Sequence, residues 1–286
     1  MTPLVHSFHD PATFTFTHVV YDRICGRAAV VDPVLDFDVA SGRTSTASAE
    51  QVLAFLGEHR LSLDWVLETH AHADHLSAAA FLKRRTGAKV AIGRGITAVQ
   101  ERFKTLFGLE DDFATDGRQF DRLFDDGDTF AIGALRARVL GTPGHTSDGV
   151  SYQVGDAVFV GDTLFAPETG TARADFPGAD ARTLYTSLRR LLELPPETRL
   201  FLCHDYPSQT HTVQAMTTVA EQRARNIHVG GGAGEDAYVA LRTTRDAALP
   251  VPKLILPALQ ANIRAGELPP PVANGVRYLR LPLDQI

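Results

Sequence analysis

The 286-residue chain is 44% hydrophobic and 22% charged, an ordinary balance for a globular protein with a full core. Its formal net charge of −6 gives no electrostatic reason to expect nucleic acid or an anionic membrane as a partner, and no apolar run is long enough to span a bilayer. The first residues lack the basic and apolar segments of a signal peptide, and two cysteines, Cys25 and Cys203, give no disulfide framework. We therefore expect a cytoplasmic protein.

Alternating and apolar runs predict strands, and apolar side chains at helical spacing predict helices. In chain order we expect strands at 14–21 and 27–31, a helix over 48–59, a strand at 63–67, a helix over 76–85, a strand at 89–92, a helical stretch with a loop within 94–120, hairpins between 123 and 152, a strand at 157–160, a helix over 184–192, a strand at 200–203 and a helix over 212–225. Ser48 and Gln51 match a capping box, Gly87 is a typical helix stop, and Asp180 can cap the helix that follows it.

The order of these elements indicates the architecture. Each strand-rich half of the chain ends in helices, which favours two packed sheets with helices on the outside. The glycine run 230–232 marks a joint, and residues 233–286 form a proline-rich tail for which we expect one helix.

A dense group of metal-ligand side chains lies between the strand at 63–67 and the helix that follows it. Three histidines and a carboxylate, His70, His72, Asp74 and His75, fall within six residues. Imidazole and carboxylate are ligands of Zn, Fe and Mn. The alternative, solvated loop histidines, does not account for such a density, and in a core each imidazole would need its own polar partner. The sequence therefore predicts a metal site.

Three later residues repeat the pattern of a strand followed by a ligand. His145, Asp162 and His204 each come shortly after a predicted strand. Each alone is more often a structural hydrogen bonder, but strand ends from two sheets can meet at one rim. Asp32, at the end of the strand at 27–31, is either functional or a turn cap.

The set of motifs resembles the metallo-β-lactamase fold superfamily over roughly residues 10–228. The resemblance implies an α+β fold, an αββα sandwich of two mixed β-sheets with helices on the outer faces and a metal site at the shared sheet edge. It divides the chain into a catalytic domain, 1–229, and a C-terminal extension, 230–286, packed on the same domain. In the hydrolases of this superfamily two metals bind, and the matching ligands here are His70, His72 and His145 for one metal, Asp74, His75 and His204 for the other, and Asp162 as the bridge.

Flanking motifs are similar to those of one branch, the persulfide dioxygenases of bacterial type. The similar segments are 14–17, 161–165, 170–176, 184–185, 203–206, 252–253 and 262–266. This resemblance implies one Fe(II) per chain, held by the catalytic residues His70, His145 and Asp162. The remaining residues of the set could then orient the iron ligands or hold a second metal. They are His72, Asp74, His75 and His204. The chain departs from the branch at Ala174, in place of a cysteine, and at His228, in place of an arginine.

The implied reaction is the oxidation of glutathione persulfide with O2 and water to sulfite and glutathione. Two imidazoles and one carboxylate leave three positions of an iron open, as in non-haem Fe(II) oxygenases. Glutathione carries two carboxylates, so we expect Arg173 to bind substrate, with Tyr206 and His228 as weaker candidates. The alternative for Arg173 is a salt bridge to Asp175 or Asp205.

Two other functions stay open on the sequence alone. A dinuclear zinc hydrolase of glutathione thioesters, similar to glyoxalase II, needs the same seven ligands. A non-catalytic metal-binding or sulfur-carrier protein would need a closed coordination shell, which this ligand set does not favour. The sequence also leaves open a homodimer and a separate sulfurtransferase partner.

Overall fold

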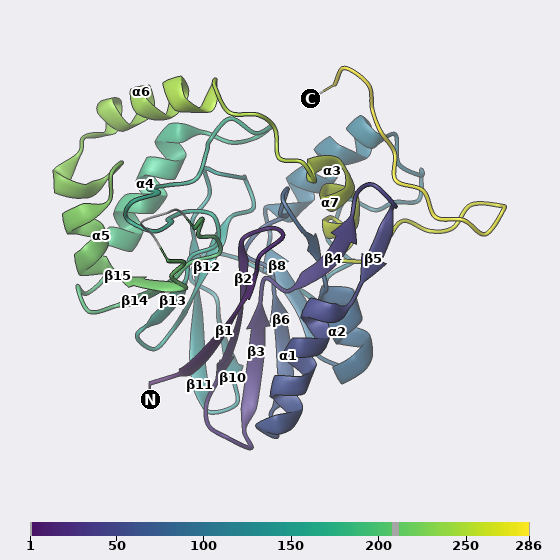
Figure 1. The fold of residues 1–286 in the computed structure, drawn as a ribbon, viewed down its shortest axis with the longest axis horizontal. Coiled ribbons are helices and arrows are strands. Elements are labelled where there is room, and N and C mark those ends of the chain that lie inside the picture. Colours follow the sequence, from purple (N-terminus) through teal and green to yellow (C-terminus); the bar gives the residue numbers. More distant parts are fainter. Residues whose placement is uncertain (1, 208–211, 286) are drawn as a thin grey trace.

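The strands of this protein form two facing β-sheets. In the computed structural model, which describes residues 2–207 and 212–285, each of the two is six-stranded, and a three-stranded sheet lies beside them (Figure 1). The first sheet runs in the order β1 (Leu4–Asp10), β2 (Thr15–Tyr21), β3 (Arg27–Val31), β6 (Ser62–Leu67), β8 (Lys89–Gly93) and β9 (Arg122–Phe124). The second runs β10 (Thr129–Ile132), β11 (Leu135–Gly141), β12 (Val150–Val154), β13 (Ala157–Phe159), β14 (Arg199–Phe201) and β15 (Met216–Thr218). The small sheet is β5 (Arg43–Ser45), β4 (Val34–Asp38) and β7 (Leu76–Ser77).

Helices cover the outer face of each large sheet. They are α1 (Ala47–Glu58), α2 (Ala79–Thr86), α3 (Ile96–Phe107), α4 (Ala181–Leu192), α5 (Val219–Arg225), α6 (Glu235–Asp246) and α7 (Ile255–Asn262), with a 3-10 turn, η1 (Gly230–Gly232). Both large sheets are mixed, because β3, β6, β8 and β9 pair in parallel and so do β13 and β14, whereas the other neighbours are antiparallel. The predicted αββα sandwich is confirmed.

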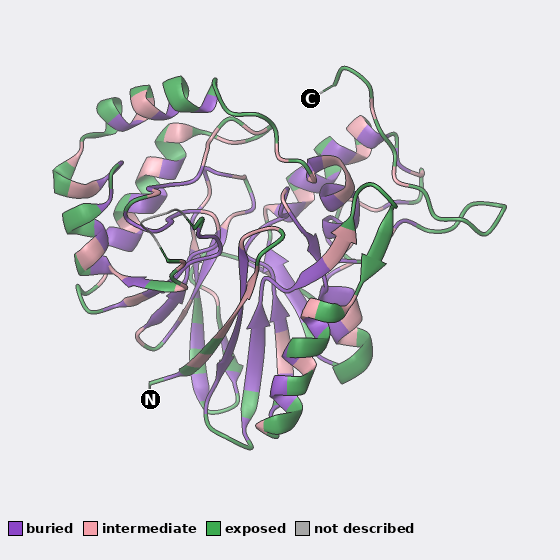
Figure 2. Ribbon diagram, in the orientation of Figure 1, coloured by how far each residue is buried: buried purple, intermediate pink, exposed green. Residues whose placement is uncertain are grey.

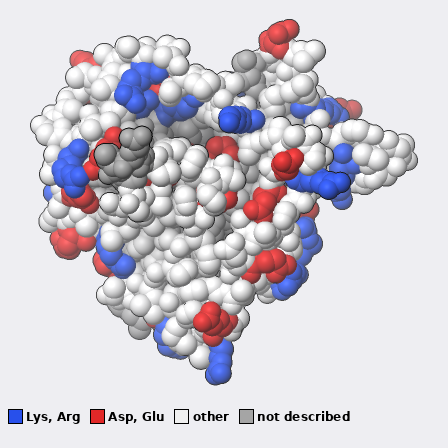
Figure 3. Space-filling view, viewed as in Figure 1, with Lys and Arg blue, Asp and Glu red and all other residues white. Residues whose placement is uncertain are grey.

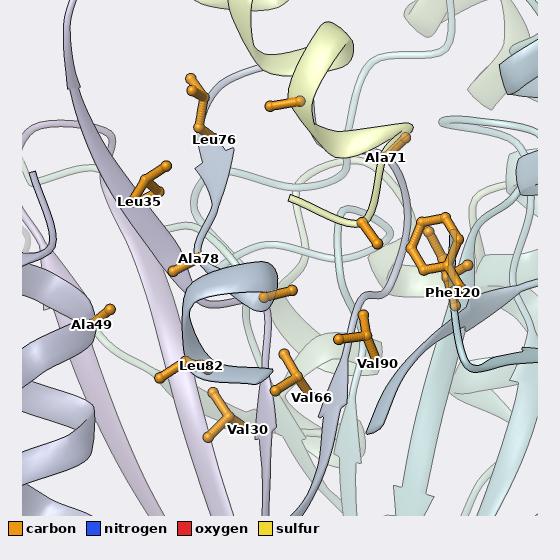
Figure 4. Packing of buried hydrophobic residues seen from close by; sticks show 14 of the residues in the cluster. Val30, Leu35, Ala49, Val66, Ala71, Leu76, Ala78, Leu82, Val90 and Phe120 are labelled. Atoms are coloured by element: carbon orange, nitrogen blue, oxygen red, sulfur yellow. The ribbon is translucent and has the colours of Figure 1, made fainter. Parts of the chain in front are cut away.

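Strand alternation divides the core into layers. In β3, Ala28 and Val30 face the helices, whereas Ala29 and Val31 face the second sheet, as expected for side chains that alternate along a strand. Figure 4 shows Val30 with Leu82 of α2 in the outer layer. Figure 2 shows mostly buried strands and helices whose outward faces are exposed. Burial of apolar side chains in these layers is the main stabilising term of the fold.

Some local predictions are confirmed. Gly87 ends α2 in the left-handed conformation, with φ +76°, and Asp180 caps α4 by accepting a hydrogen bond from the Thr183 backbone N–H. The capping box is wrong, because α1 begins at Ala47 and the Ser48 hydroxyl donates to Asp36 instead (Oγ to Oδ1, 2.6 Å).

Two helix predictions include residues that pair as strands. Leu76 and Ser77 form β7 by pairing with β4, so α2 begins only at Ala79. The expected helix over 212–225 is shorter, since Met216–Thr218 form β15 on the edge of the second sheet and α5 follows. In both cases pairing with a distant strand outweighs local helix propensity.

The tail holds two helices where one was expected. Helix α6 packs beside α4, and α7 packs against β7. The predicted division of the chain at residues 229 and 230 stays a prediction. Among the helices of the described ranges, none has the length and apolar character needed to cross a membrane.

A buried histidine in β2 makes the stability of the fold depend on pH. The His18 Nε2–H donates to the Leu202 carbonyl (2.8 Å), and Nδ1 lies 2.8 Å from Ser7 Oγ. Burial lowers the pKa of His18 from 6.5 to about 4, an effect that outweighs the bond to Leu202. The unfolded chain therefore binds a proton between pH 6.5 and 4 that the folded chain does not bind, and stability falls as pH falls through this window.

We expect the lowered pKa of His18 to reduce the free energy of unfolding by about 2 kcal/mol when the pH is lowered from 8 to 5. His18→Gln should lower the stability at pH 8 but remove that part of the acid sensitivity. The measurement is urea unfolding of both proteins at pH 8 and pH 5, under the same metal conditions. Equal losses on acidification in both proteins would contradict the assignment.

Candidate metal centre

The predicted ligands meet at one edge of the sandwich because each follows the end of a strand. The metal loop, residues 69–75, follows β6, and His145, Asp162 and His204 follow β11, β13 and β14. The bridge between Thr15 and His204 joins the two large sheets at this edge. Loops from both sheets therefore surround one site, as the sequence predicts.

His70, His145 and Asp162 converge on one point. The Nε2 atoms of His70 and His145 lie 4.0 and 3.6 Å from Asp162 Oδ2, and one ligand atom of each residue lies within 4.8 Å of the others. The His145 Nδ1–H donates to the Arg173 carbonyl (2.8 Å), and His70 Nδ1 lies 3.1 Å from Thr69 Oγ1. These contacts leave both Nε2 atoms free to bind a metal.

Glycine precedes two of these ligands for steric reasons. Gly144 has φ +131° and Gly161 has φ +53°. A Cβ at Gly144 would lie 2.3 Å from the Leu184 backbone, and one at Gly161 would lie 2.5 Å from Thr69 Oγ1. Only glycine fits these turns, which aim the next side chain at the centre.

A second group lies next to the first. His72, Asp74, His75 and His204 each offer one ligand atom within 4.8 Å of the others. His204 Nε2 lies 3.0 Å from Asp74 Oδ2 and 3.3 Å from Asp162 Oδ1. All seven predicted ligands are therefore together, and the two roles predicted for the second group, a second metal or ligand orientation, both fit its position.

Electrostatics in the centre reflect burial and close charges. Burial lowers the pKa of His70 well below its usual value, and the neighbouring His72 lowers it further. For His204, burial lowers the pKa, but the carboxylates of Asp162 and Asp74 outweigh it and raise the pKa to about 10. Burial raises the pKa of the adjacent Cys203 thiol, which makes it a poor metal ligand because the thiolate is the binding form.

Buried ligand atoms without partners test whether a metal fits. Among the described residues, three ligand atoms of the centre are buried and have no hydrogen-bond partner: His70 Nε2, His72 Nδ1 and His75 Nε2. His204 Nε2 and Asp162 Oδ1 are also buried, and they lie 3.3 Å apart without a well-formed hydrogen bond. Buried polar atoms rarely lack a hydrogen-bond partner, and here several of them point into one small volume. The donor set suits Fe(II) or Zn(II).

Three buried side chains hold the backbone of the metal loop. Asp32 accepts hydrogen bonds from Thr69 N (2.8 Å) and Oγ1 (2.9 Å). Asp148 accepts from Ala71 N (2.8 Å), and Asn262 contacts the other end of the loop. Asp32 is therefore a support of the site. The sequence analysis did not identify Asp148 as a support of the site, because no motif or strand end in the sequence distinguishes it from other aspartates.

A cavity of about 650 Å³ opens beside the centre. Its lining includes Asp74, His145, Asp162, the predicted substrate residues Arg173, Tyr206 and His228, and three cationic residues of the C-terminal extension, Arg242, Arg245 and Lys253. Figure 3 shows Lys and Arg atoms beside a hollow at the top of this face, where α6 and the segment after it lie in Figure 1.

The structure shows different surroundings for the three predicted substrate residues. The Arg173 guanidinium already binds Asp175 (Nε to Oδ1, 2.6 Å) and the Pro250 carbonyl (2.7 Å), which is the salt-bridge alternative. Tyr206 is 44% exposed, and its hydroxyl bonds to no other described residue. His228 is buried and accepts a hydrogen bond from Thr171 N (3.0 Å), and burial with nearby arginines lowers its pKa to about 4. Their substrate roles stay predictions.

The extension supplies cavity residues that the sequence did not reveal. Arg242 is buried and paired with Asp246. The side chains of Arg245 and Lys253 are exposed and make no hydrogen bond or ion pair with any other residue that the structure describes. Their cationic groups are therefore available to an anionic ligand in the cavity.

Comparisons with known proteins match this geometry. The family model described as Metallo-beta-lactamase superfamily matches residues 12–204. A probable metallo-hydrolase of Burkholderia pseudomallei is 52% identical over 99% of this chain and 99% of its own, and glyoxylase B2 of Dictyostelium discoideum is 46% identical over 99% and 97%.

Proteins that carry the name ETHE1 have a lower sequence identity to this chain. The crystal structure of ETHE1 from Myxococcus xanthus superposes with a TM-score of 0.72 at 31% identity, covering 92% of this chain and 100% of that one. The human mitochondrial persulfide dioxygenase ETHE1 is 29% identical over 92% of this chain and 89% of its own.

Removal of one ligand tests the site. We expect His145→Ala to lose bound metal and activity together, because it removes one of the two free Nε2 atoms of the group. Metal content after gel filtration and turnover are the measurements. His59→Ala, a half-buried histidine at the end of α1, is the control and should keep both. Full metal content in the His145 variant would remove it from the ligand set.

Proposed function

This chain belongs to the metallo-β-lactamase superfamily, and from that premise we propose that it is a persulfide dioxygenase that oxidises glutathione persulfide at one Fe(II). The observation that carries the proposal is the convergence of His70, His145 and Asp162, with both Nε2 atoms free and the cavity adjoining them. Two imidazoles and one carboxylate on one face of a metal form the ligand set of non-haem Fe(II) oxygenases.

The overall reaction balances without a protein nucleophile. The terminal sulfur gains three oxygen atoms, two from O2 and one from water, and the sulfur–sulfur bond breaks to leave sulfite, glutathione and two protons. Iron at this site would supply the electron transfer that lets O2 react with a sulfur compound. Cys203 is buried, and Cys25 lies outside the cavity lining, so neither takes part in the proposed reaction.

The chain's own residues would bind and orient the substrate. The Arg173 carbonyl holds the ring of His145, so the segment that lines the cavity also positions a ligand. Arg245 and Lys253 place positive charge at the cavity for the carboxylates of glutathione. Phe165 and Phe176 form an apolar part of the cavity wall, against which the rest of the glutathione molecule can pack.

A second candidate is a dinuclear zinc hydrolase of glutathione thioesters. It is favoured by the close group of His72, Asp74, His75 and His204, which could hold a second metal, with Asp162 as the bridge. Two relatives that are about half identical to this chain are named metallo-hydrolase and glyoxylase B2, which supports the same candidate. Zinc held by these residues would supply the activation of water toward a thioester carbonyl.

The two candidates differ in oxygen dependence and metal content. For the Fe(II)-loaded protein we expect rapid O2 uptake with glutathione persulfide and the appearance of sulfite, with one metal per chain. A no-substrate sample and a metal-free sample are the controls. Absence of uptake, together with thioester hydrolysis by a protein that holds two zinc ions, would establish the hydrolase instead.

The cationic residues of the extension generate a separate prediction. The double substitution Arg245→Gln with Lys253→Gln should raise KM for the glutathione substrate roughly three- to tenfold, the range for two lost exposed charge pairs, with little change in kcat. Arg189→Gln, an exposed arginine of α4 outside the cavity lining, is the matched control. An unchanged KM in the double variant would exclude these two residues from recognition.

A further inference from the structure

One side chain of the C-terminal extension reaches the backbone of the metal loop. Asn262, the last residue of α7, is 5% exposed. Its Nδ2 donates to the carbonyls of His72 and His75, and its Oδ1 accepts from the Ser77 N–H, each at 2.8 Å. One amide thus satisfies three backbone groups across the segment that carries His72, Asp74 and His75.

These backbone groups have few other ways to be satisfied. Residues 69–75 lie outside the helices and strands, and the loop is almost entirely buried. A buried carbonyl without a hydrogen-bond partner is unfavourable, because it has lost its bond to water. Asparagine combines two N–H donors and one acceptor on a short side chain. Aspartate would retain only the contact with Ser77, and its oxygen would face two carbonyl oxygens.

The position of Asn262 is fixed by the packing around α7. Ile255, Leu259 and Ile263 belong to the same core cluster as Leu76. Figure 4 shows Ala71 and Leu76 beside the end of this helix. After the helix, Gly266 has φ +82°, and a Cβ there would lie 2.8 Å from the Ser77 carbonyl. The helix end and the turn after it therefore both lie against the chain that leaves the metal loop.

We propose that Asn262 is a positioning residue for the metal centre: it holds the backbone of the metal loop so that the imidazoles and carboxylate of that loop face the metal. The extension then contributes to metal affinity as well as to the cavity wall. The inference goes beyond the proposed function, because the loop supplies ligands in the iron and in the zinc candidate alike. Loss of this support should weaken metal binding by the 10- to 100-fold typical of groups that orient ligands.

A matched control lies two residues earlier on the same helix. Gln260 is 1% exposed and also makes three hydrogen bonds: Nε2 donates to the Leu256 and Arg280 carbonyls, and Oε1 accepts from Arg280 N. Gln260 therefore holds the tail near Arg280, and within the described part of the chain it makes no hydrogen bond to the metal loop. Gln260→Ala removes an equally buried amide without touching the centre.

The test compares Zn²⁺ and Co²⁺ affinity of the metal-free proteins by competition with a chromophoric chelator, alongside their thermal unfolding. Asn262→Ala should bind both ions at least tenfold more weakly than wild type and change the visible spectrum of bound Co²⁺. Gln260→Ala should stay within twofold and keep the spectrum, although its unfolding temperature falls too. Equal affinities in the two variants would overturn the proposal.

Asn262→Asp keeps the experiment decisive if the alanine variant does not fold. It preserves the side-chain volume and the acceptor for Ser77, but it removes both donors. We expect it to bind Zn²⁺ and Co²⁺ more weakly than wild type. Wild-type affinity and an unchanged Co²⁺ spectrum in this variant would overturn the proposal, whichever reaction the protein catalyses.

Discussion

Burial of an irregular loop is the constraint on which the site depends. The metal loop must keep several ligand-type side chains close together, yet it is almost entirely buried and lies outside the helices and strands, so its backbone polar groups need partners from elsewhere in the chain. Asp32, Asp148 and Asn262 supply the missing partners from three distant segments of the chain. The ligands are therefore held by hydrogen bonds to the backbone that carries them, and the surrounding core is organised to bring those three side chains there.

Both large sheets contribute candidate ligands to the site. The first provides the metal loop after β6, and the second provides His145, Asp162 and His204 after three of its strands. Because the ligands come from both sheets, the centre forms only when the sandwich is closed. A bound metal would in turn link the sheets, so metal binding and stability of the sandwich should be coupled.

The C-terminal extension completes the site from the outside. Helix α6 and the segment after it bring Arg245 and Lys253 to the cavity, and α7 brings Asn262 to the metal loop. In the roles proposed above, ligand selection and metal geometry would both involve residues beyond the part that the superfamily model matches. The same seven side chains fit both candidate functions, so the identity of the ligands does not separate a dioxygenase from a hydrolase.

The sequence by itself predicted the candidate ligands and the sandwich, because both leave local patterns: strand, short loop and ligand-type residue, with glycine before His145 and Asp162. The structure confirms the sandwich and brings the candidate ligands together. Only the tertiary structure decided what those ligands contact. Leu76 and Ser77 pair with β4 where a helix turn was predicted, and the Arg173 guanidinium, for which substrate and a salt bridge were both open, binds Asp175. Asp148 and Asn262 could not be found by pattern, since their partners lie 77 and 190 residues away and hydrogen bonds at such separations leave no local periodicity.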